Sequence, residues 1–335
     1  MIKNTIANIN EGCFQIRNSI KNSTSKIVNI LFSLMLVMVM MFSLGALTSC
    51  GKANSGELGS SSHPVKIGVV GSSRPQWIKF KSIAQNAGIY VDIIDFTDYM
   101  TPNPALDEGQ IDINEFQHIL FLAKYNVDSG KDLTPIGATV VSPICLYGDT
   151  AKNITKLDDL QQGDQIAIPN DGTNQSRALK VLEAAGLIKF VDPSKAILTP
   201  ADIDTANSKV TVDAVDAAQV PTLIKDKQVK AVVANDDFAK YLSDKDLNNV
   251  LYRENAESEA VKPYVNVWVT TKANKDNAVL KKLVDLFTNS EEIQNALVED
   301  AGGADKVELV GKDYDPEQLG EILTQQEDVY KNGTN

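Results

Sequence analysis

From residue 65 onward, short apolar runs alternate with segments whose apolar residues recur at helical spacing. Apolar runs bounded by turn residues predict strands, and the helical spacing predicts helices between them. The predicted strands are 65–71, 91–96, 133–148, 165–170, 209–216, 230–236 and 264–271, and the predicted helices include 75–88, 115–130, 173–188 and 220–228. The segment 105–113 is predicted to contain a short helix and another strand. Strands that alternate with helices indicate parallel sheets covered on both faces, so the sequence predicts an α/β fold.

The first fifty residues follow a different pattern. Four basic groups and one acid lie in residues 1–26, and the 24 residues from Ile27 to Cys50 carry no charge. A basic start followed by an apolar run is typical of an export signal, although about 20 apolar residues also suffice to cross a bilayer. The export interpretation is favoured by Leu47-Thr48-Ser49-Cys50-Gly51, which resembles the lipobox of bacterial lipoproteins. An uncleaved membrane span is the alternative.

The lipobox predicts a lipid anchor. Residues 1–49 would be removed as a signal peptide, and Cys50 would become the acylated N-terminus. Two or more acyl chains hold a protein durably on a membrane. Residues 50–63, rich in Gly and Ser after the cysteine, are predicted to form the anchor and a flexible linker. The expected location is the extracytoplasmic face of the cell membrane.

Composition narrows the possible functions of the remaining 335 − 49 = 286 residues, which suit one large or two medium domains. Their side chains sum to −15, because the whole chain carries −12 and the first 49 residues carry +3. Such acidity argues against nucleic acid as a partner. Cys145 is the only cysteine left, so no intrachain disulfide is expected, and its apolar surroundings indicate a small buried side chain.

Two histidines, His63 and His118, are too few for a metal site built on His and Cys clusters. The chain contains neither a phosphate-binding loop of the type G-x-x-x-x-G-K-[ST] nor a G-x-S-x-G nucleophile motif. The sequence therefore predicts no metal, no cofactor and no enzymatic activity.

Polar residues at predicted strand ends are candidate ligand contacts, because α/β lobes bind ligands at the carboxyl ends of their strands. Arg177 falls within about the first turn of a predicted helix, where a cation opposes the helix dipole. Its guanidinium would suit a ligand carboxylate, and a salt bridge to an acid of the chain is the alternative. Asn235 and Asn266 stand at the edges of apolar strands, where a buried amide must be hydrogen-bonded.

An aromatic group gathers round His118 in the segment 95–121. Its members are Tyr99, Phe116 and Phe121. On the pattern alone, packing in a hydrophobic core is the favoured explanation for these side chains.

Three segments together resemble the NlpA lipoproteins, which are substrate-binding proteins of methionine-type ABC importers. They are DYMTPNPALDEGQIDINEFQH, IAIPNDGTNQSRALKVLEAAGLIK and VKPYVNV, in that order, and the resemblance runs from about Val65 to the last helices. It implies a two-lobed periplasmic-binding-protein-like fold of type II, with two α/β lobes joined by a hinge. The first lobe would comprise 64–146 plus 265–335, and the second 147–264.

The resemblance also implies roles for individual residues. Arg177 would bind the ligand carboxylate, and Asn235 and Asn266 would complete the α-amino and carboxylate contacts. The side-chain pocket would consist of Tyr99, Phe116, His118 and Phe121. Because sulfur packs favourably against aromatic edges, the implied ligand is L-methionine or a close amino acid. The implied partners are an ABC permease and its ATPase.

Two departures from the family pattern leave the ligand open. Ile119-Leu120-Phe121 replaces a frequent Lys-Pro-Tyr run, and the bulky Arg74 and Trp77 lie near the end of the first strand, as possible additional ligand contacts. A methionine-containing dipeptide such as Gly-Met is therefore the alternative ligand. An exported enzyme or an adhesion lipoprotein that borrows the fold is a third interpretation.

Overall fold

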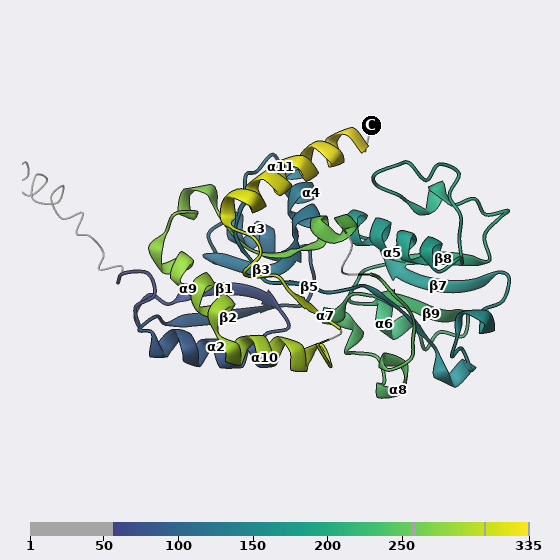
Figure 1. Ribbon diagram of the computed structural model, residues 1–335, viewed down its shortest axis with the longest axis horizontal. Helices are drawn as coiled ribbons and strands as arrows, with labels where there is room; N and C mark the ends of the chain where they lie inside the picture. Colours follow the sequence, from purple (N-terminus) through teal and green to yellow (C-terminus); the bar gives the residue numbers. More distant parts are fainter. Residues whose placement is uncertain (1–55, 256–258, 305, 334–335) are drawn as a thin grey trace, which may run out of the picture. The chain divides into compact units, whose positions relative to one another are not determined.

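Two five-stranded sheets organise the folded chain, and each forms the centre of one lobe (Figure 1). The computed structural model describes residues 56–255, 259–304 and 306–333, and residues 56–335 form one compact unit. The predicted signal peptide, the alternative membrane span and Cys50 lie outside the described residues. Among the helices that are described, none combines the length and the apolar character needed to cross a membrane.

The first lobe is built on a sheet with the strand order β2-β1-β3-β11-β4. Its strands are β1 (Val65–Val70), β2 (Val91–Phe96), β3 (Ile113–His118), β4 (Thr134–Ala138) and β11 (Asn266–Thr270). Its helices are α2 (Pro75–Asn86), α3 (Pro102–Asp107), α4 (Ile119–Ser129), α9 (Ala278–Asn289), α10 (Glu291–Asp300) and α11 (Pro316–Gly333). A two-stranded sheet of β5 (Val140–Val141) and β12 (Glu308–Leu309) adjoins it.

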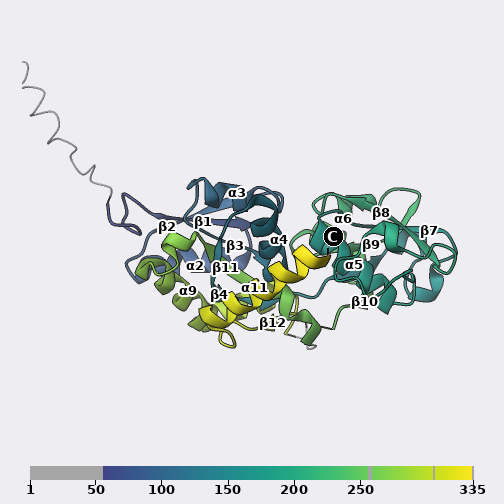
Figure 2. The same ribbon diagram turned by 90° about the horizontal axis from the view of Figure 1, so that it is seen from above.

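Helices cover both faces of this first sheet, as the alternating pattern predicted. The helices α2, α9 and α10 pack on one face, and α3, α4 and α11 on the other (Figures 1 and 2). Successive residues of β11 serve opposite faces, as the pleat of a strand requires. Trp268 packs in the cluster under α2 and α9, whereas Val267 and Val269 pack under α4 and α11.

The second lobe is built on a sheet with the strand order β10-β6-β9-β7-β8. Its strands are β6 (Cys145–Gly148), β7 (Asp164–Pro169), β8 (Val210–Val215), β9 (Val229–Ala234) and β10 (Val250–Arg253). Its helices are α5 (Gly172–Ala184), α6 (Val220–Leu223), α7 (Asp236–Ala239) and α8 (Asp244–Leu247), and short 3₁₀ turns join them. Cys145 is buried and free, as the sequence predicted for a small apolar side chain.

Both sheets are mixed, which corrects the prediction of parallel sheets. In the first sheet β1, β2 and β3 are parallel, but β11 runs antiparallel to β3 and β4. In the second sheet β7, β8 and β9 are parallel, but β6 runs antiparallel to β9. Both reversed strands follow a crossing between lobes. A chain that crosses enters the new sheet at the edge where the parallel strands end, so it must run in the opposite direction.

The chain passes from the first sheet to the second through residues 142–144 and returns through residues 254–265, which include the 3₁₀ turn η4 (Glu259–Tyr264). The sequence set the first boundary after residue 146, but β6 lies wholly in the second sheet, so this boundary falls inside a strand. The assignment of the other residues to the two lobes stays a prediction.

The predicted helix 115–130 begins later than expected. Residues up to His118 belong to β3, and α4 starts at Ile119. Strand β3 is buried along almost its whole length, and its buried amides Asn114 and Gln117 form a hydrogen-bonded network with Asn103. The strand therefore lacks the alternation of apolar and polar residues that marks a half-buried strand.

Residues 56–63 contact the folded body, so the prediction of a flexible linker is wrong for this part. The amide of Gly59 donates to the carbonyl of His63 at 2.8 Å, and the amide of Tyr90 donates to the carbonyl of Gly59 at 2.7 Å. Leu58 packs against the hydrophobic cluster beneath α2 and α9. These contacts attach the segment to the first lobe.

Candidate functional site

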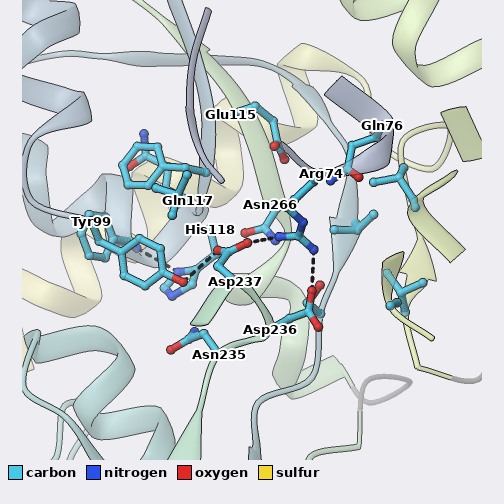
Figure 3. Close-up of a pocket in the computed structure, with 18 of the residues that line it drawn as sticks. Arg74, Gln76, Tyr99, Glu115, Gln117, His118, Asn235, Asp236, Asp237 and Asn266 are labelled. Carbon is cyan, nitrogen blue, oxygen red and sulfur yellow. Dashed lines mark hydrogen bonds and ion pairs between the residues drawn. The ribbon is translucent and has the colours of Figure 1, made fainter. Parts of the chain in front are cut away.

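A cavity of about 70 Å³ lies between the two lobes and brings together all nine side chains that the sequence proposed as ligand contacts (Figure 3). They are Arg74, Trp77, Tyr99, Phe116, His118, Phe121, Arg177, Asn235 and Asn266. Seven of these come from the first lobe, whereas Arg177 and Asn235 come from the second. A ligand in this cavity would contact both lobes at once. The lipidation candidate Cys50 lies outside the described residues.

Arg177 is buried, with 3% of its surface exposed, and its guanidinium is held from one side. Its Nε lies 2.9 and 3.0 Å from the two carboxylate oxygens of Glu254, and Nη2 bonds the same carboxylate. Nη2 also donates to the carbonyl of Ser142 at 2.9 Å. Among the described residues Nη1 makes no hydrogen bond. The internal salt bridge left open by the sequence therefore exists, and it leaves one edge of the guanidinium unused.

The start of α5 differs from the sequence prediction. Arg177 lies in the second turn of the helix rather than the first. Asp171 caps the helix and accepts a hydrogen bond from the amide of Asn174 at 2.9 Å. The first-turn amide of Asn174 is thus occupied by the chain itself, and the carboxylate-binding capacity of this region rests on Arg177.

The orientation of the Asn235 amide is fixed by a relay that begins at Asp171. The Asp171 carboxylate only accepts, so Asn174 donates Nδ2 to it at 3.2 Å and presents Oδ1 on its other side. Asn235 then donates Nδ2 to this Oδ1 at 3.0 Å. The Oδ1 of Asn235 is buried and has no hydrogen-bond partner among the described residues. The cavity therefore contains an acceptor that requires a donor.

His118 is neutral and belongs to the same relay. Its Nδ1 accepts a hydrogen bond from the amide of Phe121 at 3.1 Å, so the proton is on Nε2, which donates to Asn174 Oδ1 at 3.3 Å. Burial, with a contribution from the Arg177 charge, lowers the pKa of His118 to about 3. The imidazole thus joins the lobes without adding a charge to the cavity.

The aromatic residues form one cluster beside the cavity. The ring centroids of Tyr99 and Phe116 are 6.1 Å apart, and those of Phe116 and Phe121 are 5.9 Å apart at a steep angle. Phe238, on α7 of the second lobe, packs 4.8 Å from Tyr99 and was not foreseen from the sequence. The cluster therefore closes across the two lobes, and three of its rings line the cavity.

Asn266 reaches the cavity because β11 is reversed. It is the first residue of β11 and pairs with His118, the last residue of β3. Its carbonyl accepts a hydrogen bond from the amide of Thr139 at 2.9 Å. The side chain lies beside Arg74 and His118 in Figure 3. Because β11 runs antiparallel to β3, its first residue, Asn266, lies at the edge of the sheet where the parallel strands end.

Arg74 bridges the two lobes with charge rather than facing the cavity as a free cation. It bonds Asp236 and Asp237 of the second lobe (Figure 3). It also bonds Asp300 of its own lobe. Burial alone would lower the pKa of Arg74, but these carboxylates outweigh it and raise the pKa above its usual value. Tyr99 donates its hydroxyl to Asp237 at 2.8 Å, a further bond between the lobes.

Trp77 lines the cavity but packs mainly in the core of the first lobe. Its ring lies 5.3 Å from that of Phe287 and 5.7 Å from that of Trp268, and only 2% of its surface is exposed. A ligand contact by Trp77 stays a prediction. The shape of the cavity at this end is set by the rigid aromatic core behind it.

Sequence reasoning missed seven polar residues of the described cavity lining, namely Gln76, Glu115, Gln117, Ser142, Asn174, Asp236 and Asp237. Some of these residues could have been predicted, because they are amides or acids next in sequence to a residue already singled out, as Asp236 is to Asn235. Gln76 is 3% exposed, and its Oε1 has no hydrogen-bond partner in the described part of the chain. The cavity thus has a second unused acceptor.

Glu115 is a carboxyl group in the wall of the cavity whose charge depends on pH near neutrality. Thr139 donates its hydroxyl to Glu115 at 2.7 Å. Burial raises the pKa of Glu115 from 4.5 to about 7, against the hydrogen bond from Thr139, which lowers it. The nearby charge of Asp237 raises the pKa further.

We expect Glu115→Gln to stabilise the protein increasingly as pH rises from 5 to 7.5. Between pH 4.5 and 7 the folded wild type keeps a proton that the unfolded chain has released, so its stability falls with rising pH. Glutamine does not titrate, and the full difference amounts to about 3 kcal/mol. Urea unfolding of both proteins at several pH values measures it. The titration of His118 cancels in this comparison, and a difference independent of pH would contradict the expectation.

The sequence model of the NlpA lipoprotein family matches residues 65–309. The D-methionine-binding lipoprotein MetQ of Escherichia coli is 34% identical over 263 residues, which cover 78% of this chain and 93% of that protein.

Solved structures are similar over most of the chain. The substrate binding protein of a methionine transporter from Streptococcus pneumoniae has a TM-score of 0.66 and 31% identity, covering 74% of this chain and 95% of that one. A nutrient binding protein from Burkholderia cenocepacia, bound to methionine, has a TM-score of 0.64 and 30% identity, covering 73% and 99%. These likenesses confirm the predicted two-lobed binding-protein fold.

Proposed function

Because the chain belongs to the NlpA lipoprotein family, we propose that it captures methionine outside the cell membrane and delivers it to an ABC importer. Two relatives support this ligand and this partner by their names: one serves a methionine transporter, and one was solved with methionine bound. The function is reversible binding, and no bond of the ligand is made or broken.

The observation that carries the proposal is the unpaired Oδ1 of Asn235 in a cavity that also contains the unused Nη1 of Arg177. The relay from Asp171 obliges Asn235 to present an acceptor. An ammonium group would satisfy this acceptor, and a carboxylate would satisfy the guanidinium. The cavity therefore offers complementary groups to the two charged ends of an α-amino acid.

The remaining lining groups suit the rest of methionine. The cluster of Tyr99, Phe116 and Phe121 offers aromatic edges, against which a thioether gains about 0.3 to 1.5 kcal/mol. Asn266, at the start of β11, would share the polar contacts of the ligand with Asn235 and Arg177. In the described lining, every charged group except Glu115 is engaged in an ion pair. The apolar side chain of the ligand would therefore meet no unpaired charge there other than Glu115.

We assign membrane attachment to Cys50, on the basis of the lipobox and of the lipoprotein family. A diacylglycerol on this cysteine and the loss of residues 1–49 would place the binding lobes on the extracytoplasmic face. The intact mass of the purified protein tests this. A mass that equals the unprocessed 335-residue chain would contradict it.

The first experiment is to denature the purified protein and to identify released small molecules by mass spectrometry, and then to titrate the refolded protein in a calorimeter. We expect methionine to be released or to bind with 1:1 stoichiometry. Because the Escherichia coli relative is named for D-methionine, both enantiomers are titrated. Leucine, similar in size but without sulfur, is the control ligand. Equal affinity for leucine and methionine would contradict the assigned ligand.

A methionine-containing dipeptide is the second candidate ligand, and one observation favours it. The second unused acceptor, Gln76 Oε1, lies in the same cavity near Glu115 (Figure 3). In a dipeptide the N-terminal ammonium lies one residue further from the carboxylate than in free methionine. It could therefore donate hydrogen bonds to Gln76 Oε1 and to Glu115. Competition between methionine and Gly-Met in the calorimeter separates the two ligands. Tighter binding of Gly-Met would move the function to peptide uptake.

A further inference from the structure

We propose that Glu254 is a positioning residue, which holds the Arg177 guanidinium so that its Nη1 edge meets the carboxylate of the ligand. This inference rests on the proposed function, because it requires a ligand carboxylate at Arg177. Nothing in the family comparison assigns a role to Glu254. The positioning role is inferred from the geometry of the ion pair between Glu254 and Arg177.

The contacts divide the guanidinium into a used and an unused edge. Glu254 takes Nε with both oxygens, at 2.9 and 3.0 Å, and it takes one hydrogen of Nη2. The second hydrogen of Nη2 goes to the carbonyl of Ser142 at 2.9 Å. A guanidinium has five N–H donors in a rigid plane, so after the contacts with described residues the two donors on Nη1 remain for a ligand.

The plane of the guanidinium is fixed as well. Tyr264 lies under it, with the central carbon of Arg177 4.2 Å from the ring centroid. Glu254 itself is anchored, because the amide of Ile144 donates to its Oε2 at 3.3 Å and its own amide donates to the carbonyl of Ile144 at 3.2 Å. Rotation of Arg177 would break several of these bonds together.

Glu254 acts from outside the cavity. Arg177 and Ser142 line the cavity, but Glu254 and Tyr264 are absent from its described lining. Glu254 therefore leaves the position of the ligand carboxylate free, and it fills the opposite edge of the same cation. Ser142 and Ile144 lie in the first crossing between lobes, and Glu254 and Tyr264 in the second. The guanidinium is thus oriented by both segments that join the lobes.

Two effects of Glu254 on a bound carboxylate have opposite signs. Its negative charge repels the ligand carboxylate, so charge alone predicts tighter methionine binding when the charge is removed. Its hydrogen bonds to Nε and Nη2 orient Nη1, so a positioning role predicts weaker methionine binding when these bonds are lost. The direction of the change in affinity therefore decides between the two.

The test compares full-length wild type with Glu254→Gln by calorimetry, using methionine and methioninamide, which lacks the carboxylate charge. We expect Glu254→Gln to weaken methionine binding by about 10- to 100-fold, the effect of losing one hydrogen bond to a charged group. Methioninamide should change by less than about threefold. Glu183→Gln, which removes an exposed carboxylate from the same helix as Arg177, is the matched control and should change neither.

The possible outcomes separate the inference from the proposed function. Equal or tighter binding of methionine by Glu254→Gln overturns the positioning role alone. A wild type that binds neither ligand overturns the proposed function and this inference with it. Should Glu254→Gln fail to fold, Tyr264→Leu removes the ring that supports the guanidinium, and Tyr264 itself is not among the described lining residues. It should weaken methionine more than methioninamide, and equal changes in both would overturn the inference.

Discussion

Replacing Arg177 with alanine is expected to weaken methionine binding by about 2 to 5 kcal/mol, or about 30- to 5,000-fold in Kd. The substitution removes the cation whose Nη1 edge is unused in the described structure, and it leaves a buried ligand carboxylate without a charged partner. It also leaves Glu254 without its ion pair. Calorimetric titration of methionine measures the loss.

Two controls make this expectation specific. Lys180→Ala removes a cation three residues further along α5, outside the described cavity lining, and should leave the affinity unchanged. Arg177→Lys keeps the charge but loses the planar fork, and should give an intermediate loss. The helical signal in circular dichroism establishes that each variant is folded. Wild-type affinity in a folded Arg177→Ala variant would remove the assigned role.

Replacing Arg74 with alanine is expected to lower the free energy of unfolding by about 3 to 5 kcal/mol. Arg74 is the shared partner of Asp236, Asp237 and Asp300, and its side chain is 14% exposed. Its loss leaves three partly buried carboxylates without their shared cation. Burial already raises the pKa of Asp236 despite the nearby charge of Arg74, and without that charge the carboxyl group should be protonated at higher pH still.

Urea unfolding of the ligand-free protein measures this effect. Lys195→Ala provides the matched control, because Lys195 pairs with Asp202 but is 49% exposed, and exposed pairs contribute about 0 to 1 kcal/mol. Asp300→Asn removes only the pair within the first lobe and keeps the pairs between lobes. A loss for Arg74→Ala no larger than that for Lys195→Ala would show that the cluster is not a stabilising link between the lobes.

The sequence predicted the type of most elements but not the direction of two strands. The alternation of strands and helices predicted the α/β fold, and the resemblance predicted the two lobes. The reversal of β6 and β11 could not be read from their residues, because both strands are apolar and almost wholly buried, like the parallel strands of the same sheets. Direction is set by where the chain enters the sheet, and that depends on the crossings between lobes.

The start of α4 shows the limit of periodicity. Residues 115–118 continue the apolar pattern of the helix, so pattern alone extends the helix through them. In the structure His118 ends the strand and caps the helix with its Nδ1. The cap is a local contact with the amide of Phe121, but the apolar spacing does not mark it. The amide network joins Asn114 and Gln117 to Asn103, 11 and 14 positions away in the sequence.

For the site, the sequence singled out side chains that share one cavity, but it did not single out the residues that orient them. All nine proposed contacts line one cavity. The partner of Arg177 is Glu254, 77 positions away, and Asn235 is oriented by Asn174, 61 positions away. A sequence of this acidity contains many carboxylates, so nothing local distinguished Glu254 from the others.

The attachment of residues 56–63 to the first lobe shortens the free linker between the folded lobes and the proposed lipid anchor. With the lipid at Cys50, as proposed, the first described residue lies 56 − 50 = 6 positions after the lipidated cysteine. Six residues span at most about 20 Å, even when fully stretched. The receptor would thus search for its transporter by travelling with its lipid in the plane of the bilayer. A transporter that engages it must offer a docking face close to the membrane surface.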